Sequence, residues 1–174
     1  MNALLPIEAE EFLSWMASER GRSRNTLAAY RRDLTAYCAW LAGHHSSLLT
    51  VDRAQLDQFV QARRASGAAP SSVARQLAAI RMLHRFMAEE DLRLDNPAAD
   101  VEGVRVPAGI PHPLSEVEIV ALLAAVVATD PASLRDRALL EFLYATGARI
   151  SEACDLSLGD LDRDNRLVRL FGKG

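Results

Sequence analysis

The side chains best suited to chemistry lie near the end of the 174-residue sequence, at Arg149 and Lys173. Arg149 belongs to Thr146-Gly147-Ala148-Arg149-Ile150-Ser151-Glu152, and Lys173 to Phe171-Gly172-Lys173-Gly174. An arginine can hold two phosphate oxygens at once, and a lysine supplies a mobile proton donor. Lys173 is the only lysine, since the other 19 basic residues are arginines. The pattern predicts a phosphate-handling site made by an arginine after a helix stop and a lysine on a strand tip.

Glu152 is an acidic residue close enough in the sequence to pair with Arg149. The two residues are three positions apart, and residues at that spacing share a face of a short helix. The same spacing allows a purely structural alternative, in which the guanidinium caps the preceding helix and pairs with Glu152 or Asp155. The residues by themselves leave both interpretations open.

The charge distribution indicates a polyanion-binding surface in the first half of the chain. The formal net charge is −3, but residues 20–93 carry +6 between acidic flanks of −4 and −5. A basic middle region can attract nucleic acid although the whole protein is acidic. A solvated arginine-rich surface without a ligand is the alternative.

Residues 1–102 are predicted to form a domain of four helices. Polar N-cap residues stand before the second and third helices, and a proline opens the fourth. The second helix carries an apolar stripe from Leu27 to Leu41 at helical spacing. The four helices are expected to begin near Glu8, Ser23, Asp52 and Pro70 and to end near Arg20, Gly43, Gly67 and Glu90.

Apolar and basic residues fall on opposite sides of the fourth helix at about 100° per residue. The apolar side consists of Val73, Leu77, Ile80, Leu83 and Met87, and the basic side of Arg75, Arg81 and Arg85. We expect the arginines to form one solvent-facing strip. A helix with such a strip can enter the DNA major groove and meet its phosphates.

A linker and a second unit follow. Residues 103–113 hold three prolines and two glycines, so they are expected to be extended. Residues 114–174 are predicted to contain a helix that a Ser115–Glu118 capping box opens and that runs to Ala128. A helix from Leu134 to Thr146 and a short helix from Ile150 to Leu156 come next. On the middle helix, the residues expected on the buried side are Leu139, Leu140, Phe142, Leu143 and Tyr144.

Residues 166–171 form the only strand that the sequence predicts. A strand needs a partner for its N–H and C=O groups, and no second strand is evident in the pattern. We therefore expect the chain to stop inside a larger domain, with Lys173 at the turn of a hairpin whose return strand is missing. The predicted fold class is mainly α, with a four-helix domain followed by the first part of an α+β domain that holds one strand of a β-hairpin.

These residues resemble the tyrosine recombinases, also called the phage-integrase family, and most closely its Xer-type site-specific recombinases. The resemblance covers the whole chain, including Asn96-Pro97, the Leu114–Glu118 helix start, the Thr146–Glu152 block and Gly172-Lys173-Gly174. It implies that residues 1–102 are a SAM-like core-binding domain. It also implies that residues 114–174 are the N-terminal, incomplete portion of a catalytic domain.

The chemistry that the resemblance implies is attack of a tyrosine hydroxyl on DNA, giving a 3′-phosphotyrosyl intermediate without metal or ATP. Arg149 matches the family's first catalytic arginine, which stabilises charge in the transition state. Lys173 matches the hairpin lysine that protonates the leaving 5′-oxygen. Glu152 matches a supporting acidic residue. Chromosome dimer resolution is one role that an Xer-type resemblance suggests.

The sequence departs from the family in the groups that follow the lysine. It has no match for the His-x-x-Arg pair, for a further His or Trp, or for the tyrosine nucleophile. Tyr30, Tyr37 and Tyr144 do not occupy the nucleophile position. This chain alone is therefore expected to bind DNA weakly and not to cut it.

Double-stranded DNA is the expected partner, joined by further recombinase protomers in a synaptic tetramer when the protein is full length. In the family, helices matching the second and fourth here approach the major groove. The expected DNA contacts are Arg24, Arg31, Arg32, Arg75, Arg81 and Arg85. Two alternatives remain open, namely a non-catalytic DNA-binding fragment and a helical module whose arginines bind acidic protein partners.

Several other classes are disfavoured. The longest apolar run, residues 119–128, is shorter than the roughly 20 residues that a membrane helix needs, and the N-terminus lacks the pattern of a secretory signal. Cys38 and Cys154 are isolated, as expected for reduced core residues of a cytoplasmic protein. The histidines show no metal-ligand spacing, and no glycine-rich loop suits ATP, so neither a metal nor another cofactor is expected.

Overall fold

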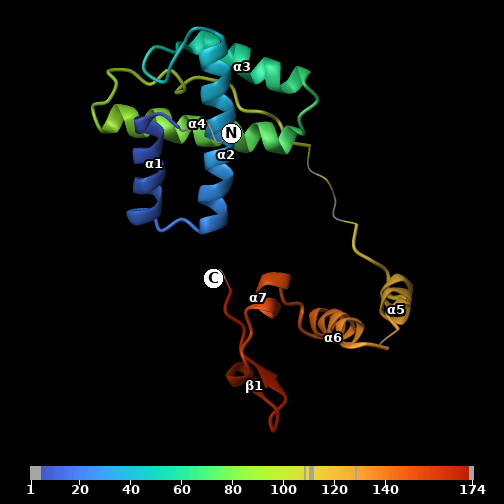
Figure 1. Cartoon of the computed structure of the whole chain (residues 1–174). Coiled ribbons are helices and arrows are strands. Elements are labelled where there is room, and N and C mark those ends of the chain that lie inside the picture. The colour runs from blue at the N-terminus through green and yellow to red at the C-terminus, as the bar shows by residue number, and fades with distance from the viewer. Residues whose placement is uncertain (1–4, 108, 110–111, 128, 173–174) are drawn as a thin grey trace. The chain divides into compact units, whose positions relative to one another are not determined.

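A computed structural model of the chain describes residues 5–107, 109, 112–127 and 129–172 (Figure 1). The chain divides into two compact units, Met1–Gly109 and Ile110–Gly174. The first unit buries an apolar core, whereas the α-helices among the described residues of the second unit contain no buried residue.

Four helices form the first unit, as predicted. Their bounds are Ile7–Ser18 for α1, Arg24–Gly43 for α2, Arg53–Ala65 for α3 and Pro70–Glu89 for α4. Helix α4 contacts each of the other three, and in Figure 1 it lies across α1 and α2. Because α4 contacts all three other helices, its sequence contributes both to the core and to one exposed face of the unit.

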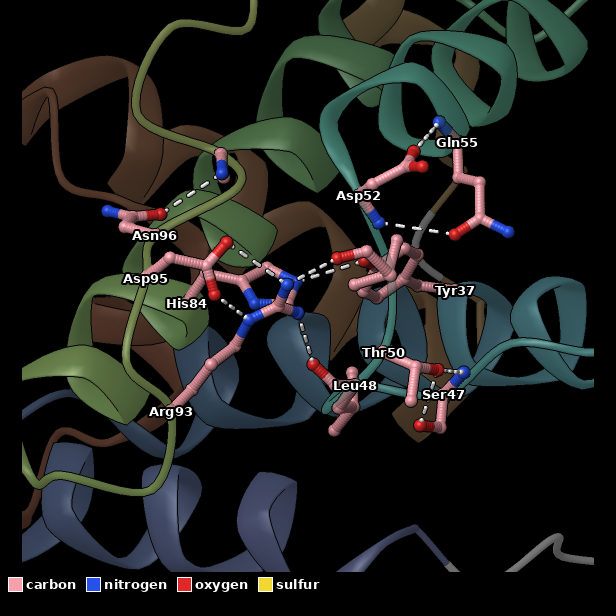
Figure 2. Close-up of polar contacts among 12 residues, drawn as sticks. Tyr37, Ser47, Leu48, Thr50, Asp52, Gln55, His84, Arg93, Asp95 and Asn96 are labelled. Carbon is pink, nitrogen blue, oxygen red and sulfur yellow. Dashed lines mark hydrogen bonds and ion pairs between the residues drawn. The ribbon is translucent and has the colours of Figure 1, made fainter.

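Side-chain caps begin the second and third helices where the sequence predicts them. The Thr26 N–H donates to Ser23 Oγ at 3.4 Å ahead of α2. Ahead of α3, the Gln55 N–H donates to Asp52 Oδ1 at 2.8 Å, and the Asp52 N–H donates back to Gln55 Oε1 at 3.2 Å (Figure 2). These bonds satisfy backbone N–H groups that have no partner inside a helix.

The core of the first unit lies under the apolar side of α4. All five predicted apolar residues of this helix are buried: Val73, Leu77, Ile80, Leu83 and Met87. Aromatic rings pack around them, with Phe12 of α1 and Phe86 of α4 5.7 Å apart and Tyr37 of α2 and Phe59 of α3 5.1 Å apart between ring centroids. The prediction of one buried face on α4 is confirmed.

Arg93 ties the end of the helical core to the loop between α2 and α3. Its Nη1 donates to the Leu48 carbonyl at 2.9 Å and its Nη2 to the Val51 carbonyl at 2.6 Å, while Nε pairs with Asp95 at 2.6 Å (Figure 2). Only 10% of the Arg93 side chain is exposed. A planar guanidinium can serve three acceptors in this way, which a lysine cannot do with the same geometry.

The second unit contains three helices and a small hairpin among its described residues. The bounds are Glu116–Ala125 for α5, Pro131–Thr146 for α6, Ile150–Cys154 for α7, Leu158–Asp160 for the 3-10 helix η1, Leu161–Asp162 for β1 and Leu167–Val168 for β2. Helix α5 ends before the predicted limit at Ala128, which lies outside the described residues. Helix α6 begins three residues earlier than predicted, because Asp130 caps it and Pro131 is its first residue, where a helix needs no N–H donor.

The prediction of an unpaired strand is wrong. Strand β2 pairs antiparallel with β1, so that Leu161 faces Val168 and Asp162 faces Leu167. Asp162 holds the turn between them, accepting the Asn165 N–H at 3.0 Å and the Asn165 side-chain amide at 2.8 Å. The partner strand is only two residues long, and two residues are too few for the alternation that identifies a strand in a sequence.

No residue of α5, α6 or α7 is buried in the described part of the second unit. Tyr144, predicted to lie on the buried side of α6, is 60% exposed, and its apolar neighbours on that side are at most half-buried. Cys154 is also exposed rather than a core residue, whereas Cys38 is half-buried in the first unit. The helical pattern indicated which side of α6 is apolar but not whether anything covers it.

Within the described ranges, none of the helices has the length and apolar character to cross a membrane. In the same residues, no three His, Cys, Asp or Glu side chains gather closely enough to hold a metal ion.

Candidate active site and nucleic-acid interface

The turn between α6 and α7 places Arg149. Gly147 ends α6 in the left-handed conformation, with φ of 66°, and its N–H donates to the Leu143 carbonyl at 2.9 Å. The Thr146 hydroxyl accepts the Ala148 N–H at 3.2 Å and donates to the Phe142 carbonyl at 2.7 Å. The chain then becomes extended at Arg149, which is the N-cap residue of α7.

Glu152 binds Arg149 through both carboxylate oxygens. Oε2 accepts the Arg149 backbone N–H at 2.8 Å, and Oε1 accepts Nη1 of the guanidinium at 2.6 Å. These two bonds, first from the backbone N–H and then from the side chain, hold the pKa of Glu152 below its usual range. The predicted pairing of the two residues is therefore present, and it fixes one edge of the guanidinium.

The exposed fractions of the two side chains differ in a way that suits a binding role for Arg149. The Arg149 side chain is 72% exposed, whereas that of Glu152 is only 11% exposed. Among the described residues, Nε and Nη2 of Arg149 make no hydrogen bond, so that edge is open to a ligand. The Glu152 contact is common to both interpretations, whereas the exposed edge is what a phosphate-binding role additionally requires.

Lys173 lies outside the described residues, so its predicted proximity to Arg149 is not tested. Its neighbour Gly172 is described and lies against the pair. A methyl group placed on Gly172 would be 2.8 Å from Glu152 Oε1 and 3.6 Å from Arg149 Nη1. The chain therefore reaches the Arg149–Glu152 pair one residue before the lysine.

The predicted DNA-contacting arginines lie on the first unit, and three of them are exposed without a hydrogen-bonding partner among the described residues. These three are Arg24 and Arg32 of α2 and Arg85 of α4. Arg75 is also exposed and pairs with Asp33 of α2 at 2.8 Å. Arg31 forms an exposed ion pair with Glu10 of α1 at 2.5 Å.

Arg81 departs from the predicted solvent-facing strip. It is half-buried, and its Nη2 donates to the Val101 carbonyl. Its Nε is buried and has no hydrogen-bonding partner in the described part of the chain. The segment after α4 returns over this side of the helix and covers Arg81, which a helical wheel of α4 alone cannot show.

Arg20, near which the first helix was expected to end, lies beside Arg85 together with Arg22. Arg20 and Arg22 line a hollow of about 230 Å³ together with Arg85 and Trp15. The Arg20 guanidinium lies 4.8 Å from the centre of the Trp15 ring, a cation–π contact. The signal was the pair of arginines around Gly21, but only the packing of α1 on α4 brings them to Arg85.

Two family models match the chain. The phage integrase N-terminal SAM-like domain matches residues 9–91, and the phage integrase family matches residues 113–174. The first match falls on the four helices, and the second includes Arg149, Glu152 and Lys173.

Curated relatives agree with these matches. The chain is 41% identical over 165 residues to the tyrosine recombinase XerD of Yersinia pestis, covering 95% of this chain and 55% of that protein. It is 38% identical over 165 residues to the tyrosine recombinase XerD of Vibrio cholerae, with the same two shares covered. The chain thus spans about half the length of the curated relatives that it matches.

Solved structures show the same fold. The Tn1549 transposon integrase, determined in complex with circular intermediate DNA, superposes with a TM-score of 0.67 at 18% identity, covering 92% of this chain and 52% of that one. The integrase from mycobacterium phage Brujita gives a TM-score of 0.51 at 20% identity, covering 95% and 54%.

Proposed function

The chain belongs to the phage integrase family of tyrosine recombinases, and from that premise we propose that the protein cleaves and rejoins DNA at specific sites through a 3′-phosphotyrosyl intermediate. The observation that carries the proposal is the Arg149–Glu152 pair. One edge of the guanidinium is fixed by Glu152, and the other edge is open in the described residues.

Arg149 and Lys173 have complementary roles in the proposed reaction. The open edge of Arg149 binds non-bridging oxygens of the scissile phosphate and stabilises the extra negative charge that develops in the transition state. Lys173 donates a proton to the 5′-oxygen as it leaves. Glu152 contacts no DNA in this scheme, since its oxygens are occupied in holding Arg149 in place.

None of Tyr30, Tyr37 and Tyr144 matches the family's nucleophile position, so we propose that the nucleophile lies outside these 174 residues. Tyr37 is buried, its hydroxyl contacts His84 Nε2 at 2.9 Å, and burial raises the pKa of that hydroxyl further above its usual range. Tyr30 contacts Met82 in the first unit. We therefore propose that this chain alone binds DNA without cutting it, and that the complete protein supplies the tyrosine.

The first unit supplies the proposed DNA-binding surface. The exposed arginines Arg24, Arg32, Arg75 and Arg85 contact phosphates, and Arg20 and Arg22 extend this surface beside Arg85. Arg31 joins them only by releasing Glu10, whose carboxylate it holds through two hydrogen bonds. Arg81 contributes least, since its guanidinium is already bonded to the Val101 carbonyl.

The role of Lys173 can be tested in the complete protein encoded by the open reading frame. Lys173→Ala and Lys173→Arg should both slow cleavage of an ordinary target site by about 10²–10⁴-fold, because neither side chain gives up a proton readily. A substrate with sulfur in place of the leaving 5′-oxygen needs no proton, so its cleavage should be close to that of the unchanged protein. If the sulfur substrate is not rescued, Lys173 is not the acid.

The biological setting is a further part of the proposal. An Xer-type recombinase in the cytoplasm would act in synaptic tetramers and resolve chromosome dimers. Disruption of the gene should then leave plasmid and chromosome dimers that accumulate only when homologous recombination is active. If the level of dimers does not change on disruption, the protein does not resolve them. Integration of mobile DNA would then be the reaction that uses the same chemistry.

A non-catalytic DNA-binding product remains the second candidate, because the family's nucleophile has no match in this sequence. Extending the open reading frame past Gly174 separates the two candidates. A His-x-x-Arg pair and a late tyrosine support the recombinase. A pull-down from lysate tests the remaining alternative. If the chain still captures proteins after nuclease treatment, a module that binds acidic partners is supported instead.

A further inference from the structure

Gly172 is unusual among the glycines in the described ranges, because other atoms occupy the space where its side chain would be. A Cβ built on Gly172 would lie 2.8 Å from Glu152 Oε1, 3.6 Å from Arg149 Nη1 and 3.7 Å from Glu152 Cδ. Built on the remaining described glycines, Gly159 among them, it would meet nothing within 4 Å. A contact of 2.8 Å is shorter than any van der Waals contact of a methyl group, so something must move.

The need for glycine at this position is spatial rather than conformational. The described glycines with positive φ are Gly21, Gly67 and Gly147, and Gly172 is not one of them. An alanine could therefore adopt the backbone angles of Gly172 without the strain that it would meet at Gly147. What excludes a side chain at residue 172 is the carboxylate of Glu152.

The Glu152 carboxylate is not free to swing away from an added methyl group. Oε1, the atom that the methyl group would meet, accepts Nη1 of Arg149 at 2.6 Å, and Oε2 accepts the Arg149 N–H at 2.8 Å. Any movement of the carboxylate breaks charge-assisted bonds to Arg149. The carboxylate is also largely covered, with 11% of the side chain exposed.

The chain around Gly172 is held less firmly than the pair. The last backbone bond that fixes the hairpin in the described residues runs from the Arg169 N–H to the Asp160 carbonyl at 2.9 Å. Phe171, directly before Gly172, is 71% exposed. A side chain added at residue 172 should therefore displace the backbone around this residue rather than separate Arg149 from Glu152.

We propose that Gly172 is a positioning residue for the recombination chemistry, whose missing side chain lets the chain lie against the Arg149–Glu152 pair immediately before Lys173. The inference rests on the proposed function, since it concerns the distance between the arginine and the general acid. Consecutive Cα atoms are about 3.8 Å apart, so the backbone of Gly172 sets where Lys173 can start. A side chain at residue 172 would displace the point from which Lys173 extends, and with it the proton donor of the proposed reaction.

The test compares Gly172→Ala with Gly159→Ala in the complete protein. Gly159 is the matched control, because it lies in the same unit, has open space around its Cα and has no positive φ. Gly172→Ala should slow cleavage of an ordinary target site at least tenfold, since a displacement of about 1 Å can cost 10²-fold in rate. The substrate with a 5′-sulfur leaving group should be cleaved at nearly the unchanged rate, because it does not need the lysine.

Two results would overturn the inference while leaving the proposed function intact. Gly172→Ala could cleave both substrates as fast as Gly159→Ala, in which case the space at residue 172 is irrelevant. It could instead slow both substrates equally, in which case the general acid is not what moved. If the unchanged protein and Gly159→Ala cleave neither substrate, the recombinase proposal itself falls.

A measurement on the 174-residue chain separates movement of the lysine-bearing segment from movement of the pair. Titration of Glu152 by carbon NMR should give the same lowered pKa in Gly172→Ala as in the unchanged chain. A pKa that rises towards the ordinary glutamate value would mean that the carboxylate had left Arg149, and would overturn the assignment. Matching chemical shifts for residues of α6 and α7 away from Gly172 verify that the second unit is folded in both chains.

Discussion

Arg75 of α4 binds Asp33 of α2 through two parallel hydrogen bonds. Nε donates to Oδ2 at 2.8 Å and Nη2 donates to Oδ1 at 3.0 Å, while the neighbouring Gln76 amide donates to the Asp33 carbonyl at 3.0 Å. The Asp33 side chain is 8% exposed and that of Arg75 is 48% exposed. One arginine therefore joins two helices and also presents a fixed, partly exposed guanidinium to solvent.

Arg75→Ala should destabilise the first unit more than Arg85→Ala. Removal of Arg75 leaves a largely covered carboxylate without its donors, which costs about 1–2 kcal/mol after allowance for the exposure of the pair. Arg85 has no such partner in the described residues, so its loss should stay within about 0.5 kcal/mol. Urea unfolding should show a lower midpoint for Arg75→Ala with an unchanged slope. Equal midpoints would mean that the pair contributes nothing to stability.

The salt dependence of DNA affinity should distinguish Arg85 from Arg81. Each phosphate contact contributes about −0.9 to the slope of log affinity against log salt. Arg85→Ala should make the slope less steep by about this amount, whereas Arg81→Ala should leave it nearly unchanged because Arg81 is bonded to the Val101 carbonyl. Fluorescence anisotropy at several salt concentrations measures both. An affinity that does not respond to salt would leave the arginines as a solvated surface.

Arg93→Ala should be the most damaging substitution of an arginine in the first unit. It removes the donors to the Leu48 and Val51 carbonyls, and both of these residues are buried. Unsatisfied buried acceptors cost about 1–3 kcal/mol each, so the loss should reach about 2–4 kcal/mol. Arg53→Ala serves as the control, since the Arg53 side chain is 58% exposed and only weakly paired. Similar unfolding midpoints for the two variants would contradict the bracing role of Arg93.

The stability of the first unit should fall as the pH drops from about 6.5 to about 4. Burial, reinforced by the positive charge of Arg93, lowers the pKa of His84 to about 4, and Asp95 opposes this shift only in part. The unfolded chain then binds a proton at higher pH than the folded one, so folding is favoured above the unfolded pKa and weakened below it. The difference amounts to about 3 kcal/mol over this range.

His84→Gln is the matched variant for this pH effect, because it has no titratable ring but can still contact the Tyr37 hydroxyl. Urea unfolding between pH 5 and 7 should show a marked slope for the unchanged chain and a flat profile for the variant. A slope that persists in His84→Gln would assign the pH dependence to other groups.

Thiol labelling should separate the two cysteines. Burial raises the pKa of the Cys38 thiol to about 11, so about one molecule in a thousand carries the reactive thiolate at pH 8. Cys154 is exposed on α7. Iodoacetamide should therefore modify Cys154 at least ten times faster than Cys38 in the native chain, and at similar rates after denaturation. Faster labelling of Cys38 would contradict the packing between α1 and α2.

Local patterns in the sequence were sufficient for the helices and for the arginine–glutamate pair. The caps at Ser23 and Asp52, the apolar side of α4 and the three-residue spacing of Arg149 and Glu152 all depend on residues within a few positions of one another. Such interactions are determined by backbone geometry that every helix shares. The motif around Arg149 was recognised instead by its resemblance to the family.

Contacts between residues far apart in the sequence were decided only by the tertiary structure. Arg81 satisfies the helical wheel as well as Arg85 does, but a returning segment covers it and bonds its guanidinium. Asp33 acquires its role only where α2 meets α4, and Gly172 becomes constrained only because the hairpin brings it to Glu152. A sequence pattern specifies the direction in which a side chain leaves its own element, whereas the atoms that it meets belong to residues far away along the chain.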